Sequence, residues 1–258
     1  MSPAPSTPSS PTRVALVTGG SRGIGAATAR LGAQRGYAVA VNYVSAGAAA
    51  EALVAEIRAA GGRAEAIQAG VGQPDQIPRL FDETERRLGR VTALVNSAGK
   101  TGLASRLEEA SLDDIRSTID VNVTGLILAT REGIRRMSRR FGGPGGAIVN
   151  LSSAAATLGS TGEFVWYAAS KAAVDIFTQG VAREVAEDGV RVNAVQPGLI
   201  DTDIHAAAGK PDRVARLAPT VPIRRAGSAE ETAKPILWLL SDEASYVTGA
   251  ILRVAGGR

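Results

Sequence analysis

The sequence contains no cysteine and a single histidine, His205, among its 258 residues. Without cysteine the chain can form neither a disulfide nor a thiolate zinc site, and it has no cysteine nucleophile. One histidine cannot build a histidine-rich metal site, and it supplies at most one base for a Ser-His-Asp triad. We therefore expect no metal centre, and we interpret His205 as a surface residue rather than a catalytic base.

Long apolar runs are also missing, because no segment reaches the roughly 18 uncharged apolar residues that a membrane span needs. Residues 1–12 are rich in Pro, Ser and Thr, and they lack the charged start and the apolar stretch of a secretory signal. We interpret them as a disordered tail before a single domain at residues 13–258. The expected location is the cytoplasm, with no membrane partner.

Charge of either sign is limited, since 29 Lys and Arg face 25 Asp and Glu for a net charge of +4. One dense basic cluster consists of Arg131, Arg135, Arg136, Arg139 and Arg140. We interpret it as a solvated flank of a helix, and a phosphate-bearing substrate or another anionic partner is the alternative. No aromatic residue is interleaved with these arginines, so the pattern does not favour nucleic acid.

What the sequence does contain is a regular alternation of short apolar runs and helical patterns. The runs predict strands at residues 14–18, 38–43, 63–68, 93–96, 147–151, 191–195 and 251–254. The helical patterns lie at residues 24–35, 46–60, 75–88, 111–140, 166–186 and 228–240. Such alternation is typical of a parallel sheet covered on both faces. We predict one α/β domain, doubly wound in the Rossmann manner, with about seven parallel strands and helices on both faces.

A glycine-rich turn joins the first strand to the first helix, with Gly19, Gly23 and Gly25 in the pattern T-G-x-x-x-G-x-G. Glycines let the backbone approach a ligand closely, and the N–H groups at a helix N-terminus attract a pyrophosphate. We therefore predict a dinucleotide site at this turn, and a plain strand-to-helix loop is the alternative.

The end of the second predicted strand bears on the choice of dinucleotide. An acidic residue that binds a ribose 2′-hydroxyl is expected about 20 residues after the glycines. No Asp or Glu lies between Gly25 and Glu51, whereas Arg22 inside the turn offers positive charge to a 2′-phosphate. We therefore prefer NADP(H) over NAD(H), with a solvated loop arginine as the alternative interpretation of Arg22.

Tyr167 and Lys171 lie four positions apart in a helical pattern, so they share one face of the helix. A neighbouring ammonium favours the phenolate, and we expect it to lower the pKa of Tyr167 toward working pH. Such a phenol suits a general acid or base. Ser153 follows the strand at 147–151, where open α/β sheets place ligands. Its hydroxyl is a candidate partner for a substrate carbonyl, and a strand-end cap is the alternative.

Together these motifs resemble the short-chain dehydrogenase/reductase family, and the resemblance covers residues 14–257. The positions that carry it are residues 18–25, 96–99, 193–198 and 245–249 together with Asn122, Ser153, Tyr167, Lys171 and Thr202. Within that family the chain is similar to single-domain 3-oxoacyl-carrier-protein reductases and glucose-dehydrogenase-like reductases. The resemblance implies hydride transfer between a nicotinamide and a carbonyl or secondary alcohol, and assembly into a homotetramer.

The resemblance also implies roles for individual residues. Tyr167 would exchange the proton of the substrate oxygen, and Lys171 would lower the Tyr167 pKa and hold the nicotinamide ribose. Ser153 would orient the carbonyl, and Asn122 would hold a water in a proton relay to Lys171. The cofactor-binding residues implied are Gly19, Ser21, Arg22, Gly23, Ile24, Gly25, Asn42, Tyr43, Ser45, Gly70, Val71, Asn96, Ala98, Gly99, Tyr167, Lys171, Pro197, Gly198, Ile200 and Thr202.

Several positions depart from the family pattern. Gly70 stands where the family usually has an Asp that meets the adenine amino group, which puts adenine binding in doubt. Ala255 replaces an acidic residue near the end of the chain. One extra residue lies in the loop at 158–166, which should border the substrate. A lid over the substrate is expected near residues 203–217.

The substrate stays open on the sequence alone, as a small or medium carbonyl compound or its alcohol. A non-catalytic dinucleotide-binding sensor or scaffold on the same fold is the alternative function. Such proteins generally lose the Tyr or the Lys of the motif. This chain keeps both Tyr167 and Lys171, so we favour an enzyme.

Overall fold

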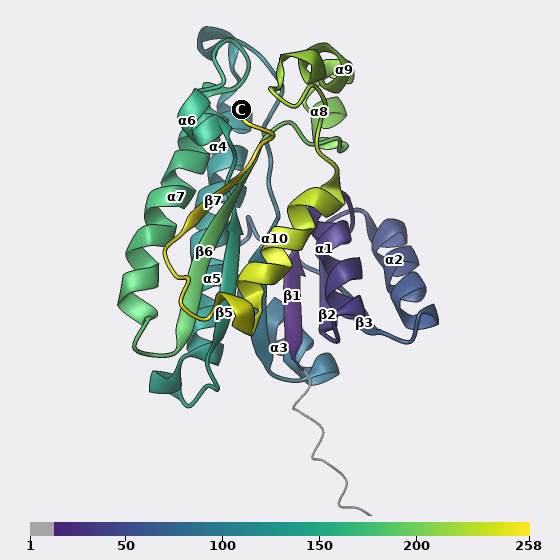
Figure 1. Ribbon diagram of the computed structural model, residues 1–258, viewed down its shortest axis with the longest axis vertical. Helices are drawn as coiled ribbons and strands as arrows, with labels where there is room; N and C mark the ends of the chain where they lie inside the picture. Colours follow the sequence, from purple (N-terminus) through teal and green to yellow (C-terminus); the bar gives the residue numbers. More distant parts are fainter. Residues whose placement is uncertain (1–12) are drawn as a thin grey trace, which may run out of the picture.

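Seven parallel strands form one sheet in the order β3-β2-β1-β4-β5-β6-β7, with helices on both faces (Figure 1). This computed structural model describes residues 13–258, so the tail predicted at residues 1–12 lies outside the described residues. Among the helices of residues 13–258, none has the length and apolar character of a membrane span. The predicted doubly wound α/β fold is confirmed.

The bounds of the elements agree with the predicted ones to within a few residues, except at 111–140. The strands are β1 (Val14–Thr18), β2 (Ala38–Tyr43), β3 (Arg63–Gln68), β4 (Val91–Asn96), β5 (Gly146–Leu151), β6 (Val190–Pro197) and β7 (Ile251–Val254). The long helices are α1 (Gly23–Gln34), α2 (Gly47–Ala59), α3 (Gln76–Leu88), α5 (Leu126–Met137), α7 (Val165–Val185) and α10 (Ala229–Leu240). The short α-helices are α4 (Leu112–Ile119), α6 (Ala155–Leu158), α8 (Ile204–Ala207) and α9 (Arg213–Leu217).

Successive side chains of the central strands pack on opposite faces of the sheet. In β1, Leu16 belongs to the core shared with α3, α5 and α7, whereas Val17 belongs to the core shared with α1, α2 and α10. All five residues of β1 are buried, and Leu16 pairs with Ala40 of β2 and Leu94 of β4. The central strands are almost entirely apolar because neither face of the sheet meets water there, whereas the edge strands β3 and β7 are partly exposed.

The order of the strands fixes where a ligand can bind. β2 and β3 are added on one side of β1, and β4 to β7 are added on the other side. In open α/β sheets, ligands bind outside the carboxyl ends of the strands at such a switch point. The topology therefore points to the carboxyl ends of β1 and β4 as the place for a site.

The long helical stretch predicted at 111–140 is present from Leu112 to Met137, but it is not one regular α-helix, because a π-helix at Asp120–Gly125 separates α4 from α5. This segment passes very close to the loop after β3, since a Cβ on Gly125 would lie 2.3 Å from the carbonyl oxygen of Val71. The wide turn also carries Asn122, whose side chain binds the backbone of Lys100 after β4. Single π-turns inside helices are frequent at functional sites.

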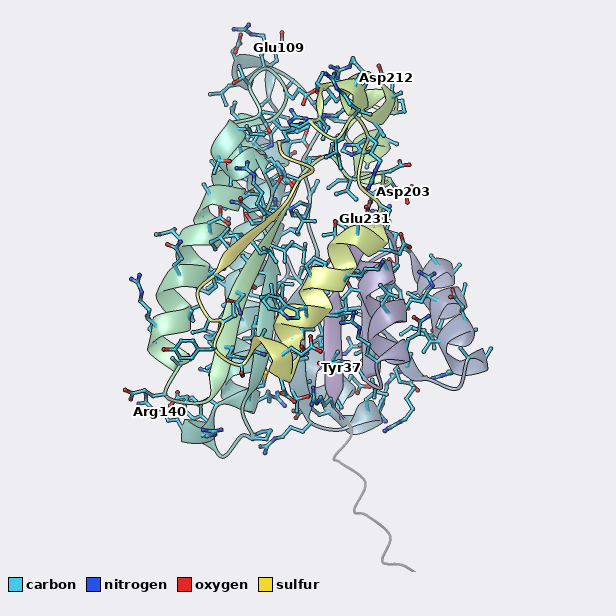
Figure 2. The ribbon with its side chains drawn as sticks, in the orientation of Figure 1. Tyr37, Glu109, Arg140, Asp203, Asp212 and Glu231 are labelled. Carbon is cyan, nitrogen blue, oxygen red and sulfur yellow. The ribbon has the colours of Figure 1, made fainter. Side chains whose placement is uncertain are left out.

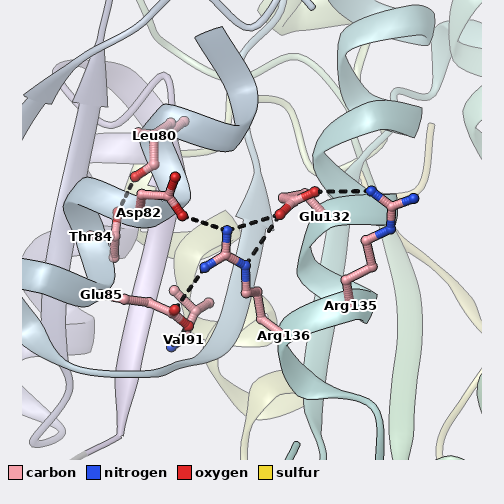
Figure 3. Close-up of polar contacts among 8 residues, drawn as sticks. All are labelled: Leu80, Asp82, Thr84, Glu85, Val91, Glu132, Arg135 and Arg136. Carbon is pink, nitrogen blue, oxygen red and sulfur yellow. Dashed lines mark hydrogen bonds and ion pairs between the residues drawn. The ribbon is translucent and has the colours of Figure 1, made fainter. Parts of the chain in front are cut away.

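The arginine cluster runs along the second half of α5 to Arg140, which lies at the end of the molecule opposite to α8 and α9 (Figure 2). Within it, Arg136 bridges two helices (Figure 3). Its guanidinium contacts Asp82 and Glu85 of α3 at 2.7 and 2.8 Å. It also contacts Glu132 of α5 at 2.9 Å. Arg136 thus neutralises the chain's own carboxylates, which weakens the alternative of an anionic partner.

The other four members of the cluster, Arg131, Arg135, Arg139 and Arg140, are exposed, as a solvated helix flank requires. Arg136 differs from them because it is only partly exposed and its guanidinium lies over the ring of the buried Phe81, with Cζ 5.9 Å from the ring centroid. Arg140 lies over the ring of Phe141, which is itself exposed. The interpretation as a solvated face is therefore confirmed for four arginines and wrong for Arg136.

We expect Arg136→Met to lower the free energy of unfolding by about 2 kcal/mol. The substitution leaves Asp82, Glu85 and the buried Glu132 close together without their shared cation. Arg131→Met on the same helix is the matched control, and it should change stability by less than about 0.5 kcal/mol. Urea denaturation measures both variants. Equal effects of the two substitutions would contradict the bridging role of Arg136.

Candidate active site

A cavity of about 1060 Å³ opens at the carboxyl ends of the strands. The segment after each strand from β1 to β6 forms part of the cavity wall. These segments are residues 19 and 21–25, 43–46, 70–73, 97–103, 152–155, and 198–200 with 202–205. The helix α7 adds Tyr167 and Lys171, and α8 and α9 also line the cavity. The site therefore lies where the strand order predicts it.

The glycine turn after β1 is packed too tightly for a side chain at Gly19 or Gly25. A Cβ on Gly25 would lie 2.3 Å from the carbonyl oxygen of Gly19. A Cβ on Gly19 would lie 2.8 Å from the Cα of Ala98, on the loop after β4. Gly23 has a φ of +52°, in the left-handed region that glycine adopts at least cost. The turn therefore presents bare backbone to the cavity.

The N-terminus of α1 begins in this turn and has no cap of its own. Arg22 at the N-cap position makes no side-chain capping bond, and the first turn of α1 contains no acidic residue. The leading N–H groups of a helix lack partners within the helix and attract anions through the helix dipole. The turn therefore fits the pyrophosphate of a dinucleotide.

The cavity wall next to the turn is free of acidic residues at the ends of β2 and β3. Residues 43–46 and 70–73 line it and include neither Asp nor Glu. Arg22 is exposed at the edge of the same cavity. A phosphate group would meet a cation here and no opposing carboxylate from these two segments.

The missing carboxylate at Gly70 is replaced by a neighbouring amide. A Cβ on Gly70 would lie 3.4 Å from the Cδ of Gln73, which lines the cavity. Gln76 donates a hydrogen bond to the side chain of Gln73 and accepts one from the backbone N–H of Gly70 at 2.7 Å. A fixed, uncharged amide thus stands where the family pattern has an Asp.

Lys171 is buried on α7, with 4% of its surface exposed. Its Nζ donates a hydrogen bond to the carbonyl oxygen of Leu151 at 2.6 Å and lies 5.7 Å from the centroid of the Tyr167 ring. Burial lowers the pKa of Lys171 to about 8, against the opposing effect of the charge on Asp175. Most of the Lys171 population therefore carries its charge at pH 7, beside the phenol.

The pKa of Tyr167 is raised, so the expectation of a lowered pKa is wrong. Burial is the main cause, and it outweighs the lowering effects of the Ser153 hydroxyl and of the charge on Arg213. The opposing effects come from Ser153 and Arg213, and not from the Lys171 ammonium that was expected to lower this pKa. At neutral pH Tyr167 is therefore a phenol that can give a proton.

Asn122 supports the site without lining the cavity. Its Nδ2 donates to the carbonyl oxygen of Lys100 at 2.8 Å and to the Ser170 hydroxyl at 3.0 Å. Its Oδ1 accepts from the N–H of Lys100 at 2.8 Å. A Cβ on Gly99 would lie 3.6 Å from this Oδ1 and 3.7 Å from the Nζ of Lys171, so both atoms flank Gly99.

Comparisons with known proteins agree with this geometry. A family model described as enoyl-(acyl carrier protein) reductase matches residues 19–258. Uncharacterized oxidoreductase YgfF of Escherichia coli (strain K12) is 49% identical over 245 residues, which are 95% of this chain and 99% of that protein. A 3-oxoacyl-[acyl-carrier-protein] reductase of Synechocystis sp. is 41% identical over 246 residues, 95% of this chain and 96% of that protein.

A likeness to solved structures extends the comparison to the fold. The crystal structure of a short chain dehydrogenase from Burkholderia cenocepacia J2315 in complex with NADP is 36% identical, with a TM-score of 0.87. The match spans 95% of this chain and 97% of the Burkholderia cenocepacia chain. This chain belongs to the short-chain dehydrogenase/reductase family. The protein is therefore an oxidoreductase of the kind that acts on CH–OH and C=O groups with NAD(P).

Most of the residues singled out by the family resemblance line this one cavity. Around the glycine turn they are Gly19, Ser21, Arg22, Gly23, Ile24, Gly25, Tyr43, Ser45, Gly70, Val71, Ala98 and Gly99. Beyond the turn they are Ser153, Tyr167, Lys171, Pro197, Gly198, Ile200 and Thr202. The fold thus brings the candidate dinucleotide residues and the candidate catalytic residues of this dehydrogenase/reductase into one space.

Two of the residues expected at the cofactor point into the protein instead. Asn42 of β2 donates to the carbonyl oxygen of Ala69 at 2.9 Å, and its Oδ1 accepts from the N–H of Gly19 at 3.3 Å. Asn96 of β4 donates to the Oδ1 of Asn150 at 2.9 Å. Neither asparagine lines the cavity. Both asparagines connect the ends of neighbouring strands, so they stabilise the cavity wall without facing the cavity.

Several charged residues of the cavity escaped the sequence analysis. Glu163 pairs with Arg213 at 2.7 Å and with Arg216 at 3.3 Å, and all three line the cavity. No motif marks them, because the pairs form only when α9 packs against the loop before α7. His205 is not a surface residue as expected: it is buried, and its Nε2 lies 2.9 Å from the carbonyl oxygen of Ile200.

We expect Lys171→Met to change how stability depends on pH. Between pH 8 and 10.5 the folded protein has released a proton that Lys171 in the unfolded chain still holds, so wild-type stability rises with pH there. The variant lacks this gain. From pH 8 to 10.5 the free energy of unfolding of the wild type, measured relative to the variant, should therefore rise by up to about 3 kcal/mol.

Thermal denaturation of the wild type and the variant from pH 7 to 10 measures this difference. The exposed Lys234→Met on α10 is the matched control and should follow the wild type. Parallel pH profiles for the wild type and Lys171→Met would contradict a depressed pKa at Lys171.

Proposed function

We propose that this protein is an NADP(H)-dependent oxidoreductase that transfers a hydride between the nicotinamide and a carbonyl or secondary alcohol of a small or medium substrate. The single cavity shared by the glycine turn and the Tyr167–Lys171 pair is the observation that carries the proposal. The NADP complex of the Burkholderia cenocepacia relative supports the choice of cofactor.

The residues present fit an anionic dinucleotide. Bare backbone at Gly19 and Gly25, together with the uncapped N-terminus of α1, would hold the pyrophosphate. Arg22 and Ser45 would take the 2′-phosphate, which meets no carboxylate from the ends of β2 and β3. Lys171 would bind the ribose next to the nicotinamide. Asn42 and Asn96 have no direct contact with the cofactor in this assignment, because their side chains are used inside the protein.

When bound, the nicotinamide supplies the hydride for reduction or accepts it in oxidation. In reduction, Tyr167 gives its phenolic proton to the substrate oxygen, and its raised pKa keeps that proton available at neutral pH. The ammonium of Lys171 then stabilises the phenolate left behind. Ser153 orients the carbonyl with its O–H, because its oxygen already accepts from the N–H of Ala155 at 3.1 Å.

Asn122 is a positioning residue in this proposal. Its side chain fixes the backbone of Lys100 and the hydroxyl of Ser170, which hold the loop after β4 against α7. The second lone pair of its Oδ1, beside Gly99 and Lys171, suits a water that returns a proton to the site.

We also propose a lid at residues 203–217 within a single domain at 13–258. The lid comprises α8, α9 and the turn between them, which line the cavity from one side. The proposed assembly is a homotetramer. It would cover apolar side chains that the chain leaves exposed on its long helices, such as Ile176 on α7, which is 69% exposed.

A non-catalytic dinucleotide sensor is the second candidate function. It would need the same glycine turn, the same cavity and the ribose contact of Lys171. It has no use for a phenol that lines the cavity beside that ammonium and can give a proton. The enzyme is therefore the better supported function.

Tyr167→Phe is expected to reduce carbonyl reduction by NADPH about 10²- to 10⁴-fold, because it removes the proton donor. Binding of NADPH, followed by the change in its fluorescence, should stay within about twofold of the wild type. Unchanged turnover would contradict the assigned role of Tyr167. Loss of NADPH binding would instead indicate a damaged cavity.

Arg22→Ala is expected to weaken NADPH binding about tenfold or more, because a charge-assisted hydrogen bond to the 2′-phosphate is lost. NADH lacks that phosphate, so its affinity should hardly change. Arg35→Ala, at the far end of α1, is the matched control. Fluorescence titrations with both cofactors measure the affinities. An equal loss for NADPH and NADH would refute the role of Arg22 in cofactor choice.

A further inference from the structure

Two arginines of α9 face the substrate side of the cavity and share a single carboxylate. Arg213 and Arg216 are three positions apart, so they lie on one side of the helix, and both line the cavity. Glu163 accepts from Arg213 Nε at 3.0 Å and from its Nη2 at 2.7 Å. The other oxygen of Glu163 lies 3.3 Å from Nη2 of Arg216. Arg216 also approaches Asp212 at 3.9 Å, but that carboxylate is 71% exposed and does not line the cavity. Glu163 is therefore the carboxylate that faces both arginines at the cavity wall, and it balances one of their two charges.

This charge lies close to the proposed proton donor. The guanidinium carbon of Arg213 is 5.3 Å from the centroid of the Phe164 ring, and Phe164 meets Tyr167 edge-on with centroids 5.8 Å apart. The charge on Arg213 is strong enough at Tyr167 to lower the pKa of the phenol, although burial raises it more. Arg213 and Tyr167 therefore face the same substrate space, separated by one aromatic ring.

Both guanidiniums keep donors to spare. Arg213 is only 14% exposed at its side chain, and its Nη1 has no hydrogen-bond or ion-pair partner within residues 13–258. Arg216 makes its one hydrogen bond to Glu163. A guanidinium has five N–H donors in a planar fork that matches the two oxygens of a carboxylate. The wall therefore has unused donors and unbalanced charge at the same point.

Glu163 itself stays ionised. Burial raises the pKa of Glu163, but the hydrogen bonds and charges of Arg213 and Arg216 lower it further, and the net shift is downward. Glu163 thus orients the two arginines at neutral pH and cancels one of their two charges. A second carboxylate, brought by a ligand, would complete the neutralisation.

We propose that the substrates are oxo acids, whose carboxylate binds Arg213 and Arg216 while their carbonyl oxygen meets Tyr167. This inference rests on the proposed function. In the reduction the hydride forms the new C–H bond at the carbonyl carbon, and the Tyr167 proton forms the O–H bond. The carboxylate is unchanged, the cofactor leaves oxidised, and the product is a hydroxy acid.

The test compares oxo acids with their uncharged methyl esters, using NADPH as reductant. The pairs are pyruvate, acetoacetate and levulinate, each with its methyl ester, which move the carboxylate stepwise away from the carbonyl. The measured quantity is kcat/KM for the acid divided by kcat/KM for the ester. For the best pair, the wild type should favour the acid by about tenfold or more, the factor expected for one charge-assisted contact.

Three variants and one control separate anion binding from a purely structural role of the ion pair. Arg213→Gln and Arg216→Gln should each lower the acid-to-ester ratio about tenfold. Glu163→Gln should raise the ratio, because it removes a carboxylate that competes with the substrate. Arg131→Gln, exposed on α5 and not part of the cavity lining, should leave both rates unchanged. Arg216 is half-exposed, so its variant remains informative if Arg213→Gln does not fold.

The outcomes distinguish this inference from the function on which it rests. If the three ion-pair variants lower both rates in proportion, the ion pair only holds the lid, and the inference is overturned. If esters are reduced by the wild type at least as well as the acids, the inference also falls while the proposed function stands. If none of the six compounds is reduced although NADPH binds, the inference is overturned. The proposed function names no substrate and is decided separately, by comparing Tyr167→Phe with the wild type on other carbonyl compounds.

Discussion

Parallel pairing of β1 with both β2 and β4 is the constraint on which the rest of the structure depends. It sends every strand of the sheet toward the same edge, so the loops after six strands meet around one cavity. The close approach of Gly19 to Ala98 joins the loop after β1 to the loop after β4 at that edge. The glycine turn and Tyr167 therefore line the same cavity as a consequence of the strand topology.

Positive charge runs through this space from end to end. The uncapped N-terminus of α1 and Arg22 lie at the glycine turn, the buried Lys171 lies in the middle, and Arg213 and Arg216 lie beside the substrate side. The buried Lys171 and the largely buried Arg213 cost stability in this arrangement, because buried cations lose their hydration. The same positive charges favour binding, because a dinucleotide phosphate and an anionic substrate both carry the opposite charge.

The sequence predicts the strands, the long helices and the glycine turn because each has a local signal. The periodicity of apolar residues marks the helices and strands. Gly25 has a local signal as well, because the contact that requires a glycine there is with Gly19 in the same short turn. Burial has no such signal, so the raised pKa of Tyr167 and the inward orientation of Asn42 appear only in the folded chain. The pair between Glu163 and Arg213 joins positions 50 residues apart, and the π-helix depends on packing against another loop.

The most direct test of the account is a crystal structure of this protein with NADP bound. The account predicts the pyrophosphate at the N-terminus of α1, the 2′-phosphate beside Arg22, and the nicotinamide ring next to the Tyr167 hydroxyl. A dinucleotide bound elsewhere, or one whose nicotinamide lies outside the cavity that Tyr167 and Lys171 line, would contradict the claim that one cavity serves both cofactor and proton transfer.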